Sequence, residues 1–180
     1  KDKVFQPSHP LRHSAETINI LRADSDDGVN SKRPILLRYT DGGPDHRTTY
    51  TSVQLASILE FIALDLDMFV ACRTAPHQSY NNPAERSMSL LNLGLQNVSL
   101  SRAEMETGYE SQMKSMSSMN SIRNSKKENF KSAVKESVKA TIETVKSIFK
   151  RLRKTHGQVF VHDASDEEEI SQLLEMIKVL

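Results

Sequence analysis

The chain has 180 residues, of which 37% are hydrophobic, 26% charged and 6% aromatic, and its formal net charge is +1. It has no apolar run of about 18 residues, and its N-terminus lacks the charged-then-apolar order of a secretory signal. The single cysteine, Cys72, excludes an internal disulfide and a CxxC zinc site. These features disfavour a membrane span and secretion, and predict an intracellular protein with one soluble domain and an appendage.

Charge is distributed unevenly along the chain. Residues 121–154 contain eleven Lys or Arg and three Glu, whereas residues 162–180 contain one Lys and six acidic residues. A polyanion would therefore meet the basic stretch and not an evenly charged surface. The sequence begins at Lys1 and not at Met, so we expect further coding sequence upstream.

The first elements in chain order predict a small parallel sheet. Residues 1–33 are expected to be irregular, apart from a short helix over 14–22. An apolar run over 35–39 predicts a buried strand, and apolar residues at helical spacing over 51–64 precede a second apolar run over 68–72. This strand, helix, strand order is that of a βαβ unit, whose two strands are parallel.

Turn and cap residues follow these strands. The turn signal DGGP at 41–44 comes directly after the first strand. It places Asp41 at the carboxyl end of a strand, where open α/β sheets bind ligands. After the second strand, Asn82 can cap a helix and Pro83 suits the first helical position. The apolar residues that follow predict a helix running to about residue 100.

The rest of the chain is predicted to be mostly helical. Residues 101–125 are rich in Ser and Met, which is typical of a linker or a poorly packed helix. Residues 126–154 place apolar side chains three or four apart with lysines opposite, which predicts an amphipathic helix. A short strand over 159–161 and a last helix from Ser165, with acidic residues in its first turn, complete the chain.

Two stretches of the chain together resemble the catalytic domain of the DDE transposase and retroviral-integrase superfamily: RYTDGGPDHRTTY at 38–50 and RTAPHQSYNNPAERSMSLLN at 73–92. In that family a strand ends in an acidic residue before a small, turn-forming pair. A later helix, which opens with an Asn-Pro-like turn, carries a glutamate. The matching residues here are Asp41 and Glu85, and the resemblance covers roughly residues 14–100.

The resemblance implies a fold class. The family's catalytic domain is ribonuclease H-like, so the expected fold is α/β but α-rich. Residues 34–100 would form a partial ribonuclease H-like βαβα unit with a small, mostly parallel sheet. A helical extension would follow, in which 101–125 is the linker and 126–180 holds the basic amphipathic helix and the acidic terminal helix.

For function, the resemblance implies metal-dependent DNA strand transfer, as in DNA integration. Such transesterification uses two divalent ions, Mg²⁺ or Mn²⁺, held by carboxylates. Asp41 would bridge the two ions and Glu85 would bind one of them. Gly42 and Gly43 would let the backbone approach a phosphate closely. Contacts with the DNA backbone are implied for three arginines: Arg47, Arg73 and Arg86.

One part of the family pattern is missing from the chain. The family's first catalytic aspartate lies on the opening strand of the fold, well before the position of Asp41, and residues 1–33 do not read as that region. We therefore expect a truncated or domesticated domain that retains two of three carboxylates and is inactive as this chain. A two-stranded sheet is also marginal by itself.

Both carboxylates have a simpler structural interpretation as well. Asp41 before Gly-Gly-Pro is typical of a turn aspartate that bonds its own backbone. Asn82 and Glu85 have the spacing of a capping box, in which the glutamate bonds back to the amide of the cap residue. Only the joint placement of the two carboxylates favours a metal site. His46 is expected to lie in an exposed loop.

The basic helix predicted over 126–154 has several interpretations. It is a candidate for binding nucleic acid, an acidic membrane or a helix-binding groove, and a solvated face is the commonest alternative. Lys150, Arg151, Arg153 and Lys154 resemble a nuclear localisation patch, although the same charges also favour a helix C-terminus. Pairing with the acidic final helix would conceal them.

Two functions therefore stand as hypotheses. The first is the transposase-derived domain, with DNA as its partner and a nuclear location. The alternative is a non-catalytic helical interaction or nucleic-acid-binding module, in which the helices of residues 126–180 bind the partner. No membrane partner is expected, and the sequence does not indicate an oligomeric state.

Overall fold

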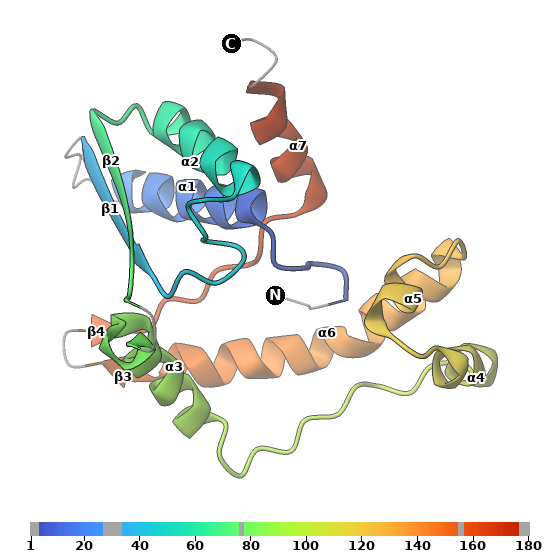
Figure 1. The fold of residues 1–180 in the computed structure, drawn as a ribbon. Coiled ribbons are helices and arrows are strands. Elements are labelled where there is room, and N and C mark those ends of the chain that lie inside the picture. Colours follow the sequence, from blue (N-terminus) through green and yellow to red (C-terminus); the bar gives the residue numbers. More distant parts are fainter. Residues whose placement is uncertain (1–3, 27–33, 76–77, 155–156, 177–180) are drawn as a thin grey trace. The chain divides into compact units, whose positions relative to one another are not determined.

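The computed structural model describes residues 4–26, 34–75, 78–154 and 157–176 (Figure 1). The chain divides into two compact units. Ser8–Arg86 and His162–Leu180 form the first, which we call the α/β unit, and Lys1–Pro7 and Ser87–Val161 form the second, which we call the helical unit. Each unit has its own cluster of buried apolar side chains.

A parallel pair of strands forms the sheet of the α/β unit. Strand β1 (Ile35–Thr40) pairs with β2 (Met68–Arg73), with Ile35 opposite Met68 and Thr40 opposite Arg73. Helix α2 (Thr51–Ala63) connects them, as the predicted βαβ order requires. The expectation of an α-rich α/β fold with a small parallel sheet is therefore confirmed.

Helices α1 (Pro10–Asp26) and α7 (Glu167–Glu175) complete the α/β unit, and both lie beside α2 in Figure 1. Four side chains from these three helices make the buried cluster: Ala15, Ile18, Leu59 and Leu173. Helix α1 is longer than the predicted 14–22, because Pro10 suits the first helical position and the helix starts there. Asp166 caps α7 in a capping box with Glu169, so the predicted acidic helix start is confirmed.

Helices cover only one face of the sheet among the described residues. Arg38 lies on the covered face and forms an ion pair with Glu60 of α2. On the opposite face, Ile35, Leu37 and Tyr39 are 59%, 65% and 45% exposed. The prediction of a buried strand over 35–39 is therefore wrong. A strand points successive side chains to opposite faces, and here one of those faces stays open.

Helix α3 (Pro83–Gly94) follows a short 3₁₀ turn, η1 (Ser79–Asn81), and its sequence crosses the boundary between the two units. The helix starts at the predicted Pro83 but ends before the predicted residue 100. Asn97 has a φ of +60°, in the left-handed region. A residue in that conformation commonly follows a helix end and does not continue it.

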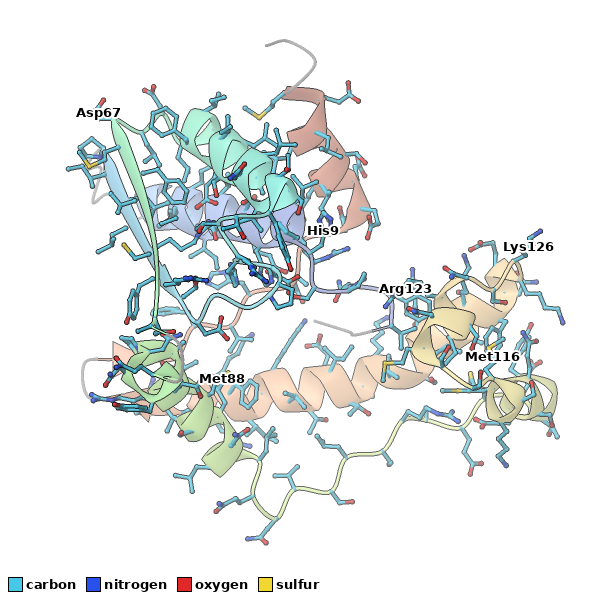
Figure 2. All side chains as sticks on the ribbon, viewed as in Figure 1. His9, Asp67, Met88, Met116, Arg123 and Lys126 are labelled. Atoms are coloured by element: carbon cyan, nitrogen blue, oxygen red, sulfur yellow. The ribbon has the colours of Figure 1, made fainter. Side chains whose placement is uncertain are left out.

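The helical unit is built around the long helix α6 (Glu128–Arg151). Two short helices, α4 (Thr107–Ser115) and α5 (Met119–Arg123), occupy much of the stretch expected to be a linker or a poorly packed helix. Three buried side chains and three partly buried methionines form the core, in which Figure 2 labels Met116: Ile122, Phe130, Val134, Met105, Met113 and Met116. Methionine fills irregular gaps well, which explains how a Met-rich segment packs.

Two short strands follow α6. Strand β3 (Arg153–Lys154) pairs antiparallel with β4 (Gly157–Gln158), whereas the strand predicted over 159–161 is not formed. Gly157 has a φ of +151°, a conformation that is essentially restricted to glycine. The strand therefore lies just before its predicted position, and the apolar triplet that indicated a strand follows it in the chain.

Candidate functional site

Asp41 lies directly after β1, at the carboxyl end of the parallel sheet, and it is exposed. Its Oδ1 accepts a hydrogen bond from the Gly43 N–H at 3.0 Å. Gly42 has a φ of +76°, and a Cβ added there would lie 3.1 Å from Cδ of Arg73. The turn therefore needs glycine at position 42, and the turn interpretation of Asp41 is confirmed.

Glu85 lies in the first turn of α3 and is exposed. Buried Asn82 caps this helix, because its Oδ1 accepts a hydrogen bond from the Ala84 N–H at 3.0 Å. The main-chain oxygen of Asn82 accepts from the Glu85 N–H, also at 3.0 Å. The predicted helix start at Asn82 and Pro83 is therefore confirmed.

Asp41 and Glu85 are the two carboxylates expected to hold metal. Asp41 and Glu85 both belong to the α/β unit. Within the described ranges, however, no three His, Cys, Asp or Glu side chains gather where they would hold an ion. A two-ion centre needs several carboxylates converging from rigid elements. The donors in the described part of the chain therefore do not fit a pair of Mg²⁺ or Mn²⁺ ions.

The three arginines predicted to contact DNA are all exposed in the α/β unit. The Arg47 guanidinium lies 5.0 Å from the centre of the Tyr50 ring and donates to the Tyr50 hydroxyl at 3.2 Å. Arg73 ends β2, with its aliphatic carbons against Gly42. Arg86 lies one residue beyond Glu85 on α3. Each guanidinium is accessible to a phosphate.

A histidine cluster joins α1 to the loop after β1. The rings of His13 and His46 have their centres 4.7 Å apart, and His13 Nε2 lies 3.7 Å from an Asp45 carboxylate oxygen. Glu16 approaches the other ring nitrogen of His13 at 3.5 Å. Burial, followed by the neighbouring His13 and Arg38, lowers the pKa of His46. His46 is therefore half-buried and not the exposed loop residue that the sequence predicts.

A buried carboxylate lies beneath the covered face of the sheet. Glu60 is fully buried, and its Oε2 forms the ion pair with Arg38 and accepts a hydrogen bond from the Ser14 hydroxyl at 2.9 Å. Burial raises the pKa of Glu60, and Arg38 and Ser14 only partly oppose that effect. The sequence carries no signal for this pair, because Arg38 and Glu60 sit in separate elements. Its position inside the unit indicates a structural role.

The lysines of α6 differ in whether an acidic side chain forms an ion pair with them. Lys131, Lys139 and Lys146 each pair with the glutamate three residues earlier, at 2.5, 3.6 and 2.7 Å respectively. Lys135 Nζ lies 5.0 Å from the centre of the Phe5 ring. The residues predicted to bind nucleic acid lie in the last turn of α6 and directly after it. No acidic side chain in the described ranges forms an ion pair with Lys150, Arg151 or Arg153, and all three are exposed.

The acidic helix α7 has its polar partners on α1. The Arg12 guanidinium, which is 2% exposed, donates to the Ser165 main-chain oxygen and pairs with Glu167. The Asn19 side-chain amide donates to Glu169 at 2.7 Å. Helix α7 therefore packs in the α/β unit, whereas the basic helix α6 belongs to the helical unit.

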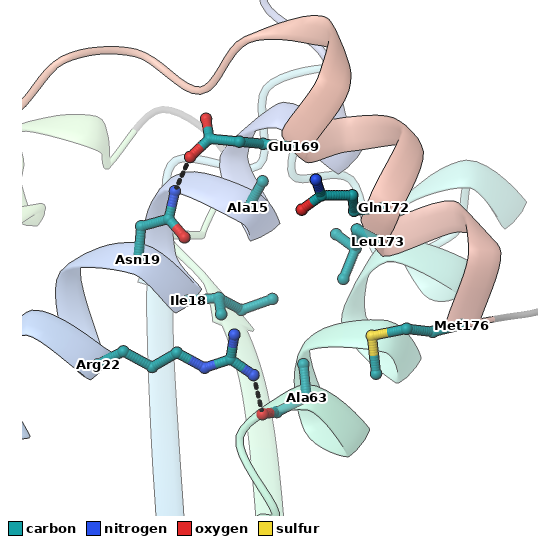
Figure 3. A pocket seen from close by; sticks show the side chains of 9 residues that line it. All are labelled: Ala15, Ile18, Asn19, Arg22, Ala63, Glu169, Gln172, Leu173 and Met176. Atoms are coloured by element: carbon teal, nitrogen blue, oxygen red, sulfur yellow. Dashed lines mark hydrogen bonds between the residues drawn. The ribbon is translucent and has the colours of Figure 1, made fainter.

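A small cavity lies between α1, the end of α2 and α7, with a volume of about 160 Å³ (Figure 3). Ile18 and Leu173 form part of its apolar wall. Two hydrogen bonds cross its polar side, since Arg22 donates to the Ala63 main-chain oxygen at 2.8 Å and Asn19 donates to Glu169 at 2.7 Å. None of the residues predicted for metal or DNA binding lines this cavity. We interpret it as a gap in helix packing.

Comparison of the chain with protein-family models, with curated proteins and with solved structures found no match. Within the described ranges, no helix combines the length and apolar character needed to cross a membrane.

Proposed function

We propose that this chain is a truncated or domesticated transposase/integrase-type domain, ancestrally a ribonuclease H-like DNA strand transferase, and that it binds DNA without cutting it. One observation carries the proposal. Asp41 follows the first strand of a parallel βαβ unit, and Glu85 stands in the first turn of the Asn82-capped helix after the second strand. Both carboxylates are exposed, so a nucleic acid could reach them.

The exposed arginines support a role in DNA binding. Arg47 follows the Asp41 turn, Arg73 ends β2, and Arg86 lies next to Glu85. A guanidinium presents a rigid fork of donors that matches phosphate oxygens. The arginines would therefore hold the DNA backbone at the same end of the unit where the family places its carboxylates.

The donor set supports the loss of catalysis. Strand transfer needs carboxylates that hold two ions about 3.5–4 Å apart, on the attacking and leaving oxygens. The described residues offer Asp41, one of whose oxygens is engaged with Gly43, and Glu85. With no third ligand among the described residues, this chain would bind the DNA backbone through its arginines but would not activate the attacking oxygen.

A cleavage assay tests this proposal directly. The purified chain is incubated with an end-labelled DNA duplex in Mg²⁺ and, separately, in Mn²⁺. We expect retarded mobility of the duplex, intact strands and a melting temperature that neither ion changes. Metal-dependent cleavage that Asp41→Asn abolishes and the exposed control Asp65→Asn retains would refute the loss of catalysis. A chain that binds no DNA would remove the DNA-binding role as well.

A second candidate is a nucleic-acid-binding or protein-binding module in the helical unit. The specific observation is the contrast along α6 between Lys139, which is paired with Glu136, and the exposed Lys150 and Arg151, which have no acidic partner in the described ranges. Together with Arg153 and Lys154 these residues resemble a nuclear localisation patch. This candidate therefore also proposes a nuclear location.

Two matched substitutions separate the candidates. Arg73→Gln and Arg151→Gln each remove one positive charge from an exposed position, so their effects on net charge are equal. If the α/β unit holds DNA, Arg73→Gln weakens binding of the duplex more. If the helical unit does, Arg151→Gln weakens it more and the salt dependence becomes shallower.

A further inference from the structure

The strand pair after α6 turns the chain back along the end of that helix (Figure 1). In this pair Arg153 lies opposite Gln158. The Val159 N–H donates to the Leu152 main-chain oxygen at 3.4 Å, and the Gln158 side-chain amide donates to the Lys150 main-chain oxygen at 3.1 Å. Residues 157–160 therefore run beside residues 150–153, and we call these two stretches together the basic ribbon.

An aromatic side chain stands out from the basic ribbon. Phe160 is 79% exposed, although its neighbour Val159 and the facing Leu152 are both partly buried. A single exposed hydrophobic residue is normal on a protein surface and needs no explanation by itself. Phe160 becomes informative because its segment, 157–160, runs beside the basic residues of 150–153.

Three of the residues in 150–153 are cations without an acidic partner in the described part of the chain. Lys150, Arg151 and Arg153 are exposed and have no acidic partner within the described residues. The helix dipole accounts for positive charge in the last turn of α6, where Lys150 and Arg151 lie. It does not account for Arg153, which lies beyond the helix, or for the exposure of Phe160. An exposed aromatic ring on a segment that runs beside several cations is a combination that proteins use for unpaired nucleotides.

We propose that the basic ribbon binds single-stranded nucleic acid, with Phe160 stacking on a base and Lys150, Arg151 and Arg153 contacting phosphates. A duplex hides the faces of its bases, whereas an unpaired base presents both faces to a ring. The ring supplies affinity without sequence preference, because every base has a π-face. This inference rests on the nucleic-acid-binding candidate for the helical unit, and it is independent of Asp41, Glu85 and metal.

Fluorescence anisotropy on the full chain tests the stacking contact. A labelled oligothymidylate is compared with a duplex of equal length, for the wild-type chain and for Phe160→Ala. We expect the wild-type chain to prefer the single strand and Phe160→Ala to weaken that binding about tenfold, within the range for one base stacked on an aromatic ring. Tyr80→Ala is the matched control, since Tyr80 is 70% exposed and belongs to the α/β unit. Its affinity should equal that of the wild type.

A tryptophan variant gives a second readout that does not depend on loss of binding. The chain contains no Trp, so Phe160→Trp places a single indole at the site. Stacking of a base on the indole should quench its fluorescence on addition of oligothymidylate, while the affinity is retained. Arg151→Gln should lower the slope of log affinity against log salt by about 0.7. Lys139→Gln, at a lysine already paired with Glu136, should leave that slope unchanged.

Several results would overturn the inference. Equal binding of single strand and duplex, or equal affinities for Phe160→Ala and Tyr80→Ala, would remove the stacking role and leave the nucleic-acid-binding candidate standing. Binding of the wild-type chain to anionic phosphatidylserine vesicles, with no binding to oligothymidylate, would show that the ribbon meets a membrane surface. Absence of binding to any nucleic acid would overturn this inference and the candidate together.

Discussion

Replacement of Arg38 by Met tests how the buried Glu60 carboxylate is held. Glu60 is fully buried, and its Oε2 is bonded to Arg38 and to the Ser14 hydroxyl. Without the guanidinium, a buried negative charge keeps only the hydroxyl. Breaking a buried ion pair in this way costs about 3–5 kcal/mol, a large fraction of the roughly 5–15 kcal/mol that stabilises a typical domain. We expect Arg38→Met to lower the free energy of unfolding at pH 7 by about that amount.

The loss should depend on pH in a defined direction. Burial raises the pKa of Glu60 above 4.5, and Arg38 opposes that rise. Arg38→Met removes the opposition, so the pKa of Glu60 rises further. A carboxyl group whose pKa is raised in the folded state contributes fully to the free energy of unfolding below its unfolded pKa of 4.5. That contribution is lost as the pH rises through the pKa of the folded state. The variant should therefore recover stability as the pH falls toward 4.5.

Urea unfolding followed by circular dichroism at pH 7 and near pH 4.5 measures both effects. The double variant Arg38→Met with Glu60→Gln should regain much of the stability at pH 7, because no charge stays buried. The exposed Arg86→Met should change stability by less than about 0.5 kcal/mol. If Arg38→Met does not fold at pH 7, it should still fold near pH 4.5. A loss below about 1 kcal/mol, or a loss that is equal at both pH values, would refute the reasoning.

Three further predictions concern other buried or strained positions. Phe130 is 0% exposed, so Phe130→Ala should destabilise the helical unit by about 3–5 kcal/mol in a thermal or urea melt. Gly42→Ala should cost about 1–2 kcal/mol, measured in the same melt, because φ is +76° there. Because the pKa of His46 is lowered from 6.5, neutral His46 contributes fully to the free energy of unfolding above pH 6.5. That contribution is lost as the pH falls through the lower pKa of the folded state, so His46→Gln should flatten this part of the curve of stability against pH.

Each of these three predictions has a contrary outcome. A Phe130→Ala chain that melts with the wild type would mean that the cluster around Phe130 does not support the fold. For position 42, the control is Gly108→Ala, where an added Cβ meets nothing within 4 Å and no left-handed φ is involved. Equal melting of the two alanine variants would contradict the strain at Gly42. An unchanged acid limb in His46→Gln would show that His46 is not the group that titrates.

The amino-acid sequence determined the elements whose signals lie within a few neighbouring residues. The order of β1, α2 and β2, the cap at Asn82 and the long helix α6 all follow from periodicity and from residues that bond to their own turn. Asp41 could be placed at the carboxyl end of β1 for the same reason. The sequence prediction of a buried strand was wrong, because burial depends on what covers a face and not on the strand itself.

Tertiary structure alone decided which distant side chains meet. His13 contacts His46, Ser14 bonds Glu60, and Asn19 bonds Glu169, each across long stretches of sequence. No local pattern encodes such pairs, since each depends on how separate elements pack. The same holds for Phe160, an ordinary apolar residue in sequence. Only the pairing of β3 with β4 brings the segment that carries its exposed ring back along the basic end of α6.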